Sequence, residues 1–221
     1  MALPAIGAKA PEPISLPDVR RLDRMPSLPA WLASRVGSMK DESQRSAADG
    51  KHRTVPTLPA NLILSPRERA EVDRHAMALD ALCAQTPAEA DEWENATLII
   101  ITKLMLALPS SQQNDVGAEA SGEAFQAALD DVPHWAVAAA VRRWYRGDCG
   151  LNERGQPYDY HWRPAPAEMR SIALVEKWRV KQRAETFRKL LAAEPLIEFA
   201  DSHCEQMRGR LAAVIPRAAP I

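Results

Sequence analysis

The stretch that decides the fold runs from Pro133 to Leu191 and reads PHWAVAAAVRRWYRGDCGLNERGQPYDYHWRPAPAEMRSIALVEKWRVKQRAETFRKLL. Its pattern predicts a helix, a tight glycine-bearing loop, a short aromatic segment and a long helix that starts at prolines. It holds four of the six tryptophans of the 221-residue chain: Trp135, Trp144, Trp162 and Trp178. We therefore expect this stretch to be the centre of packing.

The first helix of this stretch has two chemically different sides. At 100° per residue, one side carries His134, Val137, Ala138, Val141, Trp144 and Tyr145. The opposite side carries Trp135, Arg142, Arg143 and Arg146. Gly147 follows the last periodic residue, so we predict that it caps the helix.

The loop that follows leads into the long helix. Tyr158, Tyr160 and Trp162 alternate with polar residues, which predicts a brief extended segment. Pro164 and Pro166 then restart a helix with an acidic residue, Glu168, in its first turn.

The long helix presents one clear apolar face, made of Met169, Ala173, Val180, Ala184, Phe187 and Leu191. Leu174 and Trp178 lie on the opposite side, so we expect other elements to cover this helix from two sides. Pro195 begins a last predicted helix, which carries Leu196, Phe199, Cys204, Met207 and Leu211.

Upstream, two start signals predict two more helices. Ser65-Pro66-Arg67-Glu68 combines an N-cap serine, a proline at the first helical position and a glutamate at the third, and its helix extends to about Gln85. Thr86-Pro87-Ala88-Glu89 repeats the signal for a helix that Pro109 stops. The second half of that helix is apolar nearly all round, which predicts a central helix covered on several sides. A polar loop over 110–122 and a short helix over 123–130 follow.

The first 64 residues read differently. They hold eight of the eighteen prolines and the polar run Ser38–Arg53, so we predict a largely disordered arm over 1–64. Within it, Leu28 to Val36 predicts a short helix that docks on the body of the protein or on a partner. The predicted fold class is all-α: a compact domain of five or six helices over 65–214, followed by a frayed tail over 215–221.

The cysteine content and the apolar runs indicate the cellular compartment of the protein. The three cysteines, Cys83, Cys149 and Cys204, are odd in number and far apart, which argues against a disulfide framework. The longest apolar run, Leu98–Leu108, is shorter than the roughly 20 residues that cross a bilayer. The first 14 residues lack the apolar core of a secretory signal. We expect a cytoplasmic protein that does not bind membranes.

The sequence contains no pattern for catalysis or cofactor binding. It has neither G-x-x-x-x-G-K-[ST] nor G-x-G-x-x-G, and no paired C-x₂-C or H-x₃-H spacing. Cys149 has no neighbour in sequence that would lower the pKa of its thiol. We predict no catalytic residues, no metal site and no cofactor, and hence a protein that is not an enzyme.

Charge is distributed unevenly along the chain. Residues 1–64 hold nine basic and six acidic side chains, residues 65–132 four and thirteen, and residues 133–221 fifteen and ten. This asymmetry is compatible with an acidic partner for the last third or with one segment docking on another, and its more ordinary explanation is a balanced intramolecular surface.

A basic stripe stands out on the long helix. Arg170, Lys177, Lys181 and Arg188 project within about 40° of each other along roughly 27 Å of helix. Trp135, Arg142 and Arg146 form a second basic and aromatic surface one helix earlier. Cations in a row beside an aromatic ring suit a nucleic acid or another acidic partner. A stripe of lysines and arginines is more often simply a solvated or intramolecular face, and Glu176 and Glu185 dilute its positive potential.

The order of these motifs resembles a known group of proteins. A helix from Trp135-Ala136-Val137 to Trp144-Tyr145-Arg146-Gly147, an aromatic segment and then Pro164-Ala165-Pro166-Ala167-Glu168-Met169-Arg170 is similar to small all-helical proteins of phage and prophage replication cassettes. The resemblance covers roughly residues 90–175. Some of these proteins load or restrain a replicative helicase, and the missing nucleotide loop leaves the non-ATPase type of helicase loader.

Two functions therefore remain open from the sequence. The first is a non-catalytic helical adaptor, a phage-type DNA replication accessory factor whose protein partner is a replicative helicase. The alternative is a nucleic-acid-binding regulator that uses the basic stripe, with single-stranded DNA as its partner.

Overall fold

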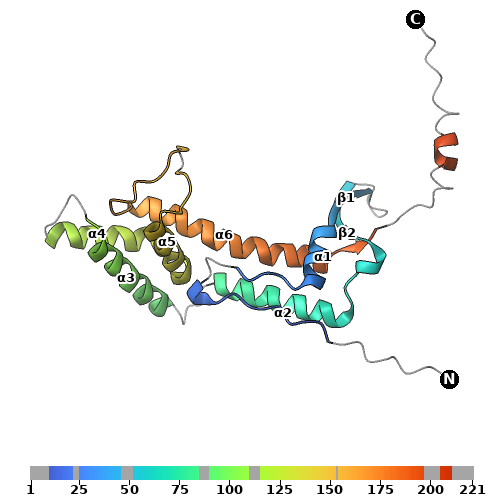
Figure 1. Ribbon diagram of the computed structural model, residues 1–221, viewed down its shortest axis with the longest axis horizontal. Helices are drawn as coiled ribbons and strands as arrows, with labels where there is room; N and C mark the ends of the chain where they lie inside the picture. Colours follow the sequence, from blue (N-terminus) through green and yellow to red (C-terminus); the bar gives the residue numbers. More distant parts are fainter. Residues whose placement is uncertain are drawn as a thin grey trace, which may run out of the picture. The chain divides into compact units, whose positions relative to one another are not determined.

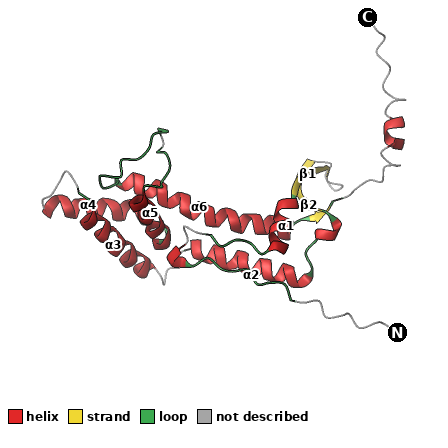
Figure 2. Cartoon of the chain, in the orientation of Figure 1, coloured by secondary structure: helices red, strands yellow, loops and turns green. Residues whose placement is uncertain are grey.

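The computed structural model describes residues 10–21, 25–45, 52–84, 90–109, 115–152, 154–196 and 205–210 (Figures 1 and 2). The chain divides into two compact units. The first comprises Met1–Gly37 with Leu64–Ala192, and the second comprises Ser38–Ile63 with Ala193–Ile221. The fold is largely helical but includes a small sheet, so the predicted all-α class is corrected.

Helices form the first unit. Its elements are η1 (Val19–Arg21), α1 (Ala30–Ser38), α2 (Pro66–Cys83), α3 (Ala90–Ala107), α4 (Asp115–Leu129), α5 (His134–Arg146) and α6 (Pro166–Leu191). The long helix α6 packs against α2, α4 and α5, while α3 packs against α4 and α5. In Figure 1, α2 runs beside the C-terminal half of α6, and α3, α4 and α5 gather at its N-terminal half.

The predicted caps at Ser65 and Gly147 are confirmed, whereas the start signal at Thr86–Glu89 lies outside the described residues. Ser65 accepts a hydrogen bond from the backbone N–H of Glu68 and donates its own N–H to the Glu68 carboxylate, which closes the capping box. Gly147 ends α5 with a φ of 68°, a left-handed conformation that favours glycine. The backbone N–H of Ala165 donates to the Glu168 carboxylate at the start of α6, at 2.8 Å.

The core confirms the predicted face of α6 and corrects the face of α5. Five of the six predicted α6 positions are buried, and Leu190 rather than Leu191 completes that face. On α5, Trp135 is buried although it was placed opposite Trp144, and Tyr145 is 49% exposed. The reason is that α5 is covered by both α3 and α6, so side chains on two sides of it are enclosed.

The aromatic loop packs back onto α5. The rings of Tyr158 and Tyr160 meet the buried ring of Trp144 edge-on, with centroids 5.5 and 5.0 Å away, while Trp162 stays 53% exposed. The predicted extended segment is reduced to a single bridge between Leu151 and Pro157. The alternation in sequence therefore marks two rings that cover the same indole.

Two predictions for α3 and α4 are corrected. Among the described residues, α3 buries only one side, and Leu98, Ile99 and Leu106 on its other side are 45%, 55% and 84% exposed. Helix α4 begins at Asp115, so it includes much of the predicted loop over 110–122. The small side chains of that segment allow a helix that offers little apolar surface to recognise in sequence.

The second unit holds the sheet that sequence reasoning missed. Strands β1 (Lys40–Arg45) and β2 (His52–Leu58) pair antiparallel, and β3 (Glu194–Pro195) pairs parallel with the end of β2. The short 3-10 helix η2 (Ala60–Leu62) follows β2. Only Thr57 and Leu58 of β2 are buried, so these strands lack the apolar alternation by which a strand is recognised.

The described part of the predicted disordered arm is therefore ordered. Besides β1 and β2, it contains the predicted short helix, α1, whose Leu32 is fully buried. Helix α1 and the segment before it both bond to α2. The Arg35 guanidinium of α1 lies 2.8 Å from the Glu68 carboxylate, and the backbone N–H of Ile14, upstream of α1, donates to Glu71 at 3.1 Å. Long-range partners give this segment an order that its prolines do not predict.

The C-terminal prediction is partly overturned. Pro195 lies in β3 rather than at the start of a helix, although residues 205–210 are helical. Phe199, Cys204, Leu211 and the predicted tail over 215–221 lie outside the described residues. Within the described part, no helix is both long and apolar enough to cross a membrane.

Candidate interaction surfaces

The predicted basic stripe on α6 is largely engaged inside the protein. The Arg170 guanidinium bonds the Asp131 carboxylate and the Ala128 carbonyl, and this hydrogen bond with Arg170 lowers the pKa of Asp131. The Lys177 ammonium donates to the Asp131 carbonyl at 2.9 Å. Arg188 pairs with Asp80 and Glu185.

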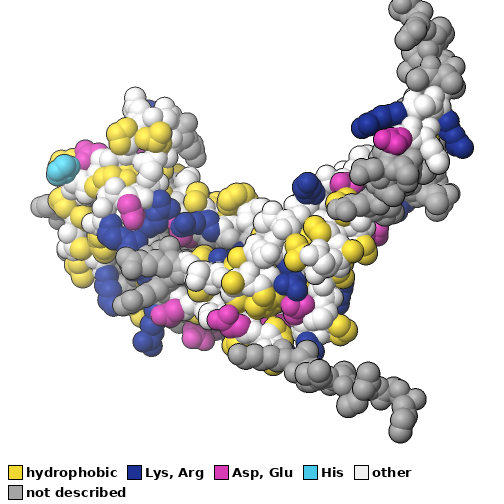
Figure 3. Space-filling view, turned by 45° about the vertical axis from the view of Figure 1, so that its right-hand side comes forward, with side chains coloured by type: hydrophobic (Ala, Val, Ile, Leu, Met, Phe, Trp, Pro, Cys, Tyr) yellow, Lys and Arg dark blue, Asp and Glu magenta, His cyan; other side chains and the backbone are white. Residues whose placement is uncertain are grey.

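Lys181 is the member of the stripe that stays exposed and forms no ion pair among the described residues. On the face shown in Figure 3, basic side chains lie close to acidic ones. The four cations therefore do not offer a continuous row to a phosphate backbone, because three of them already have partners.

The second predicted surface, on α5, does not form. Trp135 is 3% exposed, and its indole N–H donates to the Leu82 carbonyl at 2.6 Å. Arg146 is exposed and lies 3.3 Å from the Asp148 carboxylate, whereas Arg142 is half-buried. The structure thus separates the aromatic ring from the two arginines that the sequence grouped with it.

A buried carboxylate on α6 holds the junction with α5. Glu176 is 1% exposed and accepts hydrogen bonds from Arg143 at 2.7 Å and from Arg179 at 3.2 Å. Burial alone would lower the pKa of Arg143, but the hydrogen bond and charge of Glu176 outweigh it, so that pKa is raised. This cluster is a packing element, because its charges are already paired.

The outer side of α6 is apolar and uncovered among the described residues. Val175 is 49% exposed and Trp178 is 59% exposed. They line a shallow groove of about 510 Å³ together with Ser171, Leu174, Lys177 and Lys181. Sequence reasoning placed Trp178 and Leu174 on this side but expected another element to cover them. We call this region the α6 groove.

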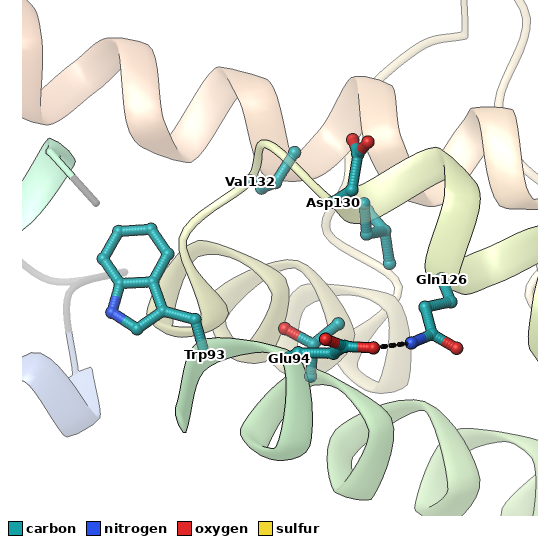
Figure 4. A pocket seen from close by; sticks show the side chains of 7 residues that line it. Trp93, Glu94, Gln126, Asp130 and Val132 are labelled. Carbon is teal, nitrogen blue, oxygen red and sulfur yellow. Dashed lines mark hydrogen bonds between the residues drawn. The ribbon is translucent and has the colours of Figure 1, made fainter. Parts of the chain in front are cut away.

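A second hollow lies between α3 and α4, and sequence reasoning missed it. It measures about 190 Å³ and is lined by Trp93, Glu94, Thr97, Gln126, Leu129, Asp130 and Val132. Figure 4 shows the Glu94 carboxylate accepting a hydrogen bond from the Gln126 amide, with Trp93 on the other side of the hollow. No local motif marks this pocket, because its walls come from two helices and the turn after them. We call it the α3–α4 pocket.

The cysteines described by the structure are poor nucleophiles. Burial is the main cause that raises the pKa of the Cys149 thiol to about 11, and burial also raises the pKa of Cys83. Both thiols are therefore protonated at neutral pH. Among the described residues, no three His, Cys, Asp or Glu side chains come together in a way that could hold a metal ion.

Comparison with protein-family models, curated proteins and solved structures finds no match to this chain. The functional argument therefore depends on the surfaces of the molecule.

Proposed function

We propose that the protein is a non-catalytic adaptor that binds another protein through the α6 groove, and that a replicative helicase is the partner to test first. The observation that carries the proposal is the exposure of Trp178 and Val175 on a rigid helix. The helicase itself comes from the resemblance of the motifs between residues 135 and 170 to phage and prophage replication proteins.

The composition of the groove suits a protein partner. Exposed aromatic side chains are enriched at the centres of protein interfaces, where a few of them supply most of the binding free energy. Trp178 is flanked by Lys177 and Lys181, whose aliphatic stems extend the apolar surface. The Lys181 ammonium is exposed, whereas the Lys177 ammonium is bonded to the Asp131 carbonyl. The groove thus offers an apolar centre with a cationic rim.

Binding to the helicase encoded in the same genome tests the proposal. Trp178→Ala should weaken capture of the purified helicase by about thirtyfold, because removing an aromatic anchor from an interface typically costs about 2 kcal/mol. The matched control is Trp162→Ala, which removes another half-exposed tryptophan, on the loop before α6. The control should bind like the unmodified protein.

Both variants should keep the thermal stability of the parent, since exposed side chains contribute little to folding. Equal weakening by the two variants, or capture that neither variant affects, would refute a helicase site in the α6 groove.

One observation favours a second function, binding of single-stranded DNA. The half-exposed Trp178 ring could stack on a base, with Lys177 and Lys181 beside it as phosphate contacts. With about two such contacts, the slope of log K against log salt should be near −1.4, since each contact releases roughly 0.7 counterion. Lys181→Glu should then weaken DNA binding. A protein-only adaptor would bind no DNA at physiological salt.

A further inference from the structure

The α3–α4 pocket combines an aromatic face, carboxylates and apolar walls. Trp93 and Glu94 come from the first two turns of α3, and Asp130 stands at the rim, pointing away from the Glu94–Gln126 pair (Figure 4). The indole of Trp93 is held in place by an edge-on contact with His134, with centroids 5.7 Å apart. Leu129 and Val132 supply the apolar part of the wall.

The pocket also contains an unused polar group. Thr97 lines the pocket and is 7% exposed as a residue, and its hydroxyl is not one of the fully enclosed polar atoms that lack a partner. The hydroxyl is therefore open to the pocket, where it can accept a hydrogen bond from a ligand. Its neighbour Glu94 keeps one carboxylate oxygen beyond the one that accepts from Gln126.

The charges around the pocket select a cation. Residues 90–132 carry eight acidic side chains and one basic one, Lys103. Neither Glu94 nor Asp130 forms an ion pair among the described residues. Burial lowers the pKa of His134, so this imidazole adds no positive charge beside Trp93 at neutral pH. Arg170 offsets part of the charge of Asp130, so Glu94 is the anion that stays open to a cationic ligand.

The size of the pocket indicates what kind of cation fits. Pockets that hold whole small molecules measure roughly 300–1,000 Å³, so about 190 Å³ suits a single side chain. An arginine matches the lining best: its planar guanidinium stacks on an indole and has five N–H donors for a carboxylate and a hydroxyl. Its methylene stem would lie against Leu129 and Val132.

We propose that the α3–α4 pocket binds an arginine side chain presented by a protein partner, with Trp93 stacking on the guanidinium and Glu94 and Thr97 accepting its hydrogen bonds. This site is distinct from the α6 groove, and the proposal does not depend on the function suggested for that groove.

The test titrates the full chain with a small probe, N-acetyl-arginine-N-methylamide, and follows the protein's ¹H–¹⁵N signals. The neutral isostere N-acetyl-citrulline-N-methylamide is the matched control ligand. We expect saturable shifts at the amides of Trp93, Glu94 and Thr97 and at the Gln126 side-chain amide, with millimolar affinity. The citrulline probe should shift these signals little.

Three substitutions test whether the arginine probe binds in the α3–α4 pocket. Glu94→Gln should weaken the arginine probe by about tenfold, as expected when a hydrogen bond to a charged group is lost. Trp93→Leu should weaken it by about threefold, the loss of a cation–π contact. Glu119→Gln, which removes the same charge from an exposed position elsewhere on α4, is the control and should bind like the parent.

Three outcomes would overturn the proposal. One is the absence of a saturable shift up to about 50 mM arginine probe. Another is an equal response to the citrulline probe. The third is a loss of affinity for the arginine probe that is as large in Glu119→Gln as in Glu94→Gln. That result would mean that the probe responds to the net charge of the protein and not to this pocket. Each variant is used only if its spectrum keeps the dispersion of the parent.

Discussion

Replacing Glu176 with alanine is the sharpest test of how α5 and α6 are joined. The carboxylate is 1% exposed and accepts hydrogen bonds from Arg143 and Arg179. Its removal leaves the Arg143 guanidinium, whose side chain is 18% exposed, without its buried anionic partner and with only the half-exposed Asp148 carboxylate, 3.4 Å away. Removing one member of a buried ion pair typically costs about 3–5 kcal/mol.

The structure places the expected loss at the low end of that range. Arg143 also donates to the Asp148 carbonyl at 3.1 Å, and water reaches part of its side chain. We therefore expect Glu176→Ala to lower the free energy of unfolding by about 3 kcal/mol. Glu176→Gln, which keeps the volume and one acceptor, should lower it by about 1–2 kcal/mol.

Urea unfolding followed by far-UV circular dichroism measures these losses, provided that the slope of the free energy with urea stays constant. The control is Glu185→Ala on the same helix, whose pair with Arg188 is about half-exposed, 52% and 50% respectively. That exposed pair should contribute less than about 1 kcal/mol.

A double-mutant cycle with Arg143→Ala should give a coupling of about 1–3 kcal/mol. If Glu176→Ala costs no more than Glu185→Ala, Glu176 lies on the surface and the proposed junction is wrong.

Two further predictions concern pH and the aromatic core. Burial, followed by the charge of Arg183, lowers the pKa of His75 to about 4, against about 6.5 in the unfolded chain. As the pH falls, the unfolded chain binds this proton before the folded one does, so the free energy of unfolding should fall by up to about 3 kcal/mol between pH 6.5 and pH 4. In a plot of the urea midpoint against pH, His75→Leu should remove this decrease. Trp144→Ala should cost about 3–5 kcal/mol, since Trp144 is 2% exposed beneath two tyrosine rings. A loss below about 1 kcal/mol in the same assay would place its ring at the surface.

Several features could be predicted from the sequence because their causes are local. The capping box at Ser65, the proline start of α6 and the left-handed Gly147 each depend on residues within one turn of helix. The apolar face of α6 repeats over many turns, so its period was clear and its burial is confirmed. Tryptophan content correctly pointed to Trp144 as a packing centre.

The candidate sites depended on partners distant in sequence. Arg170 and Arg188 read as free cations until the fold brought Asp131 and Asp80 beside them, 39 and 108 residues away. No local pattern marks the burial of Glu176, because its partner, Arg143, lies on another helix. A local sequence pattern shows which side chains can carry charge, but it does not show which residue pairs with each of them in the folded protein.

The sequence by itself determined where most helices begin and end, that α6 is long and amphipathic, and which side chains could carry charge. Only the tertiary structure decided which of those charges remain available and which apolar sides stay uncovered. It paired β1 with β2 without an apolar alternation, left Trp178 at the surface and closed a pocket between α3 and α4. Helix caps and periodicity act within a few residues, whereas burial and ion pairing depend on packing between segments that the chain keeps far apart.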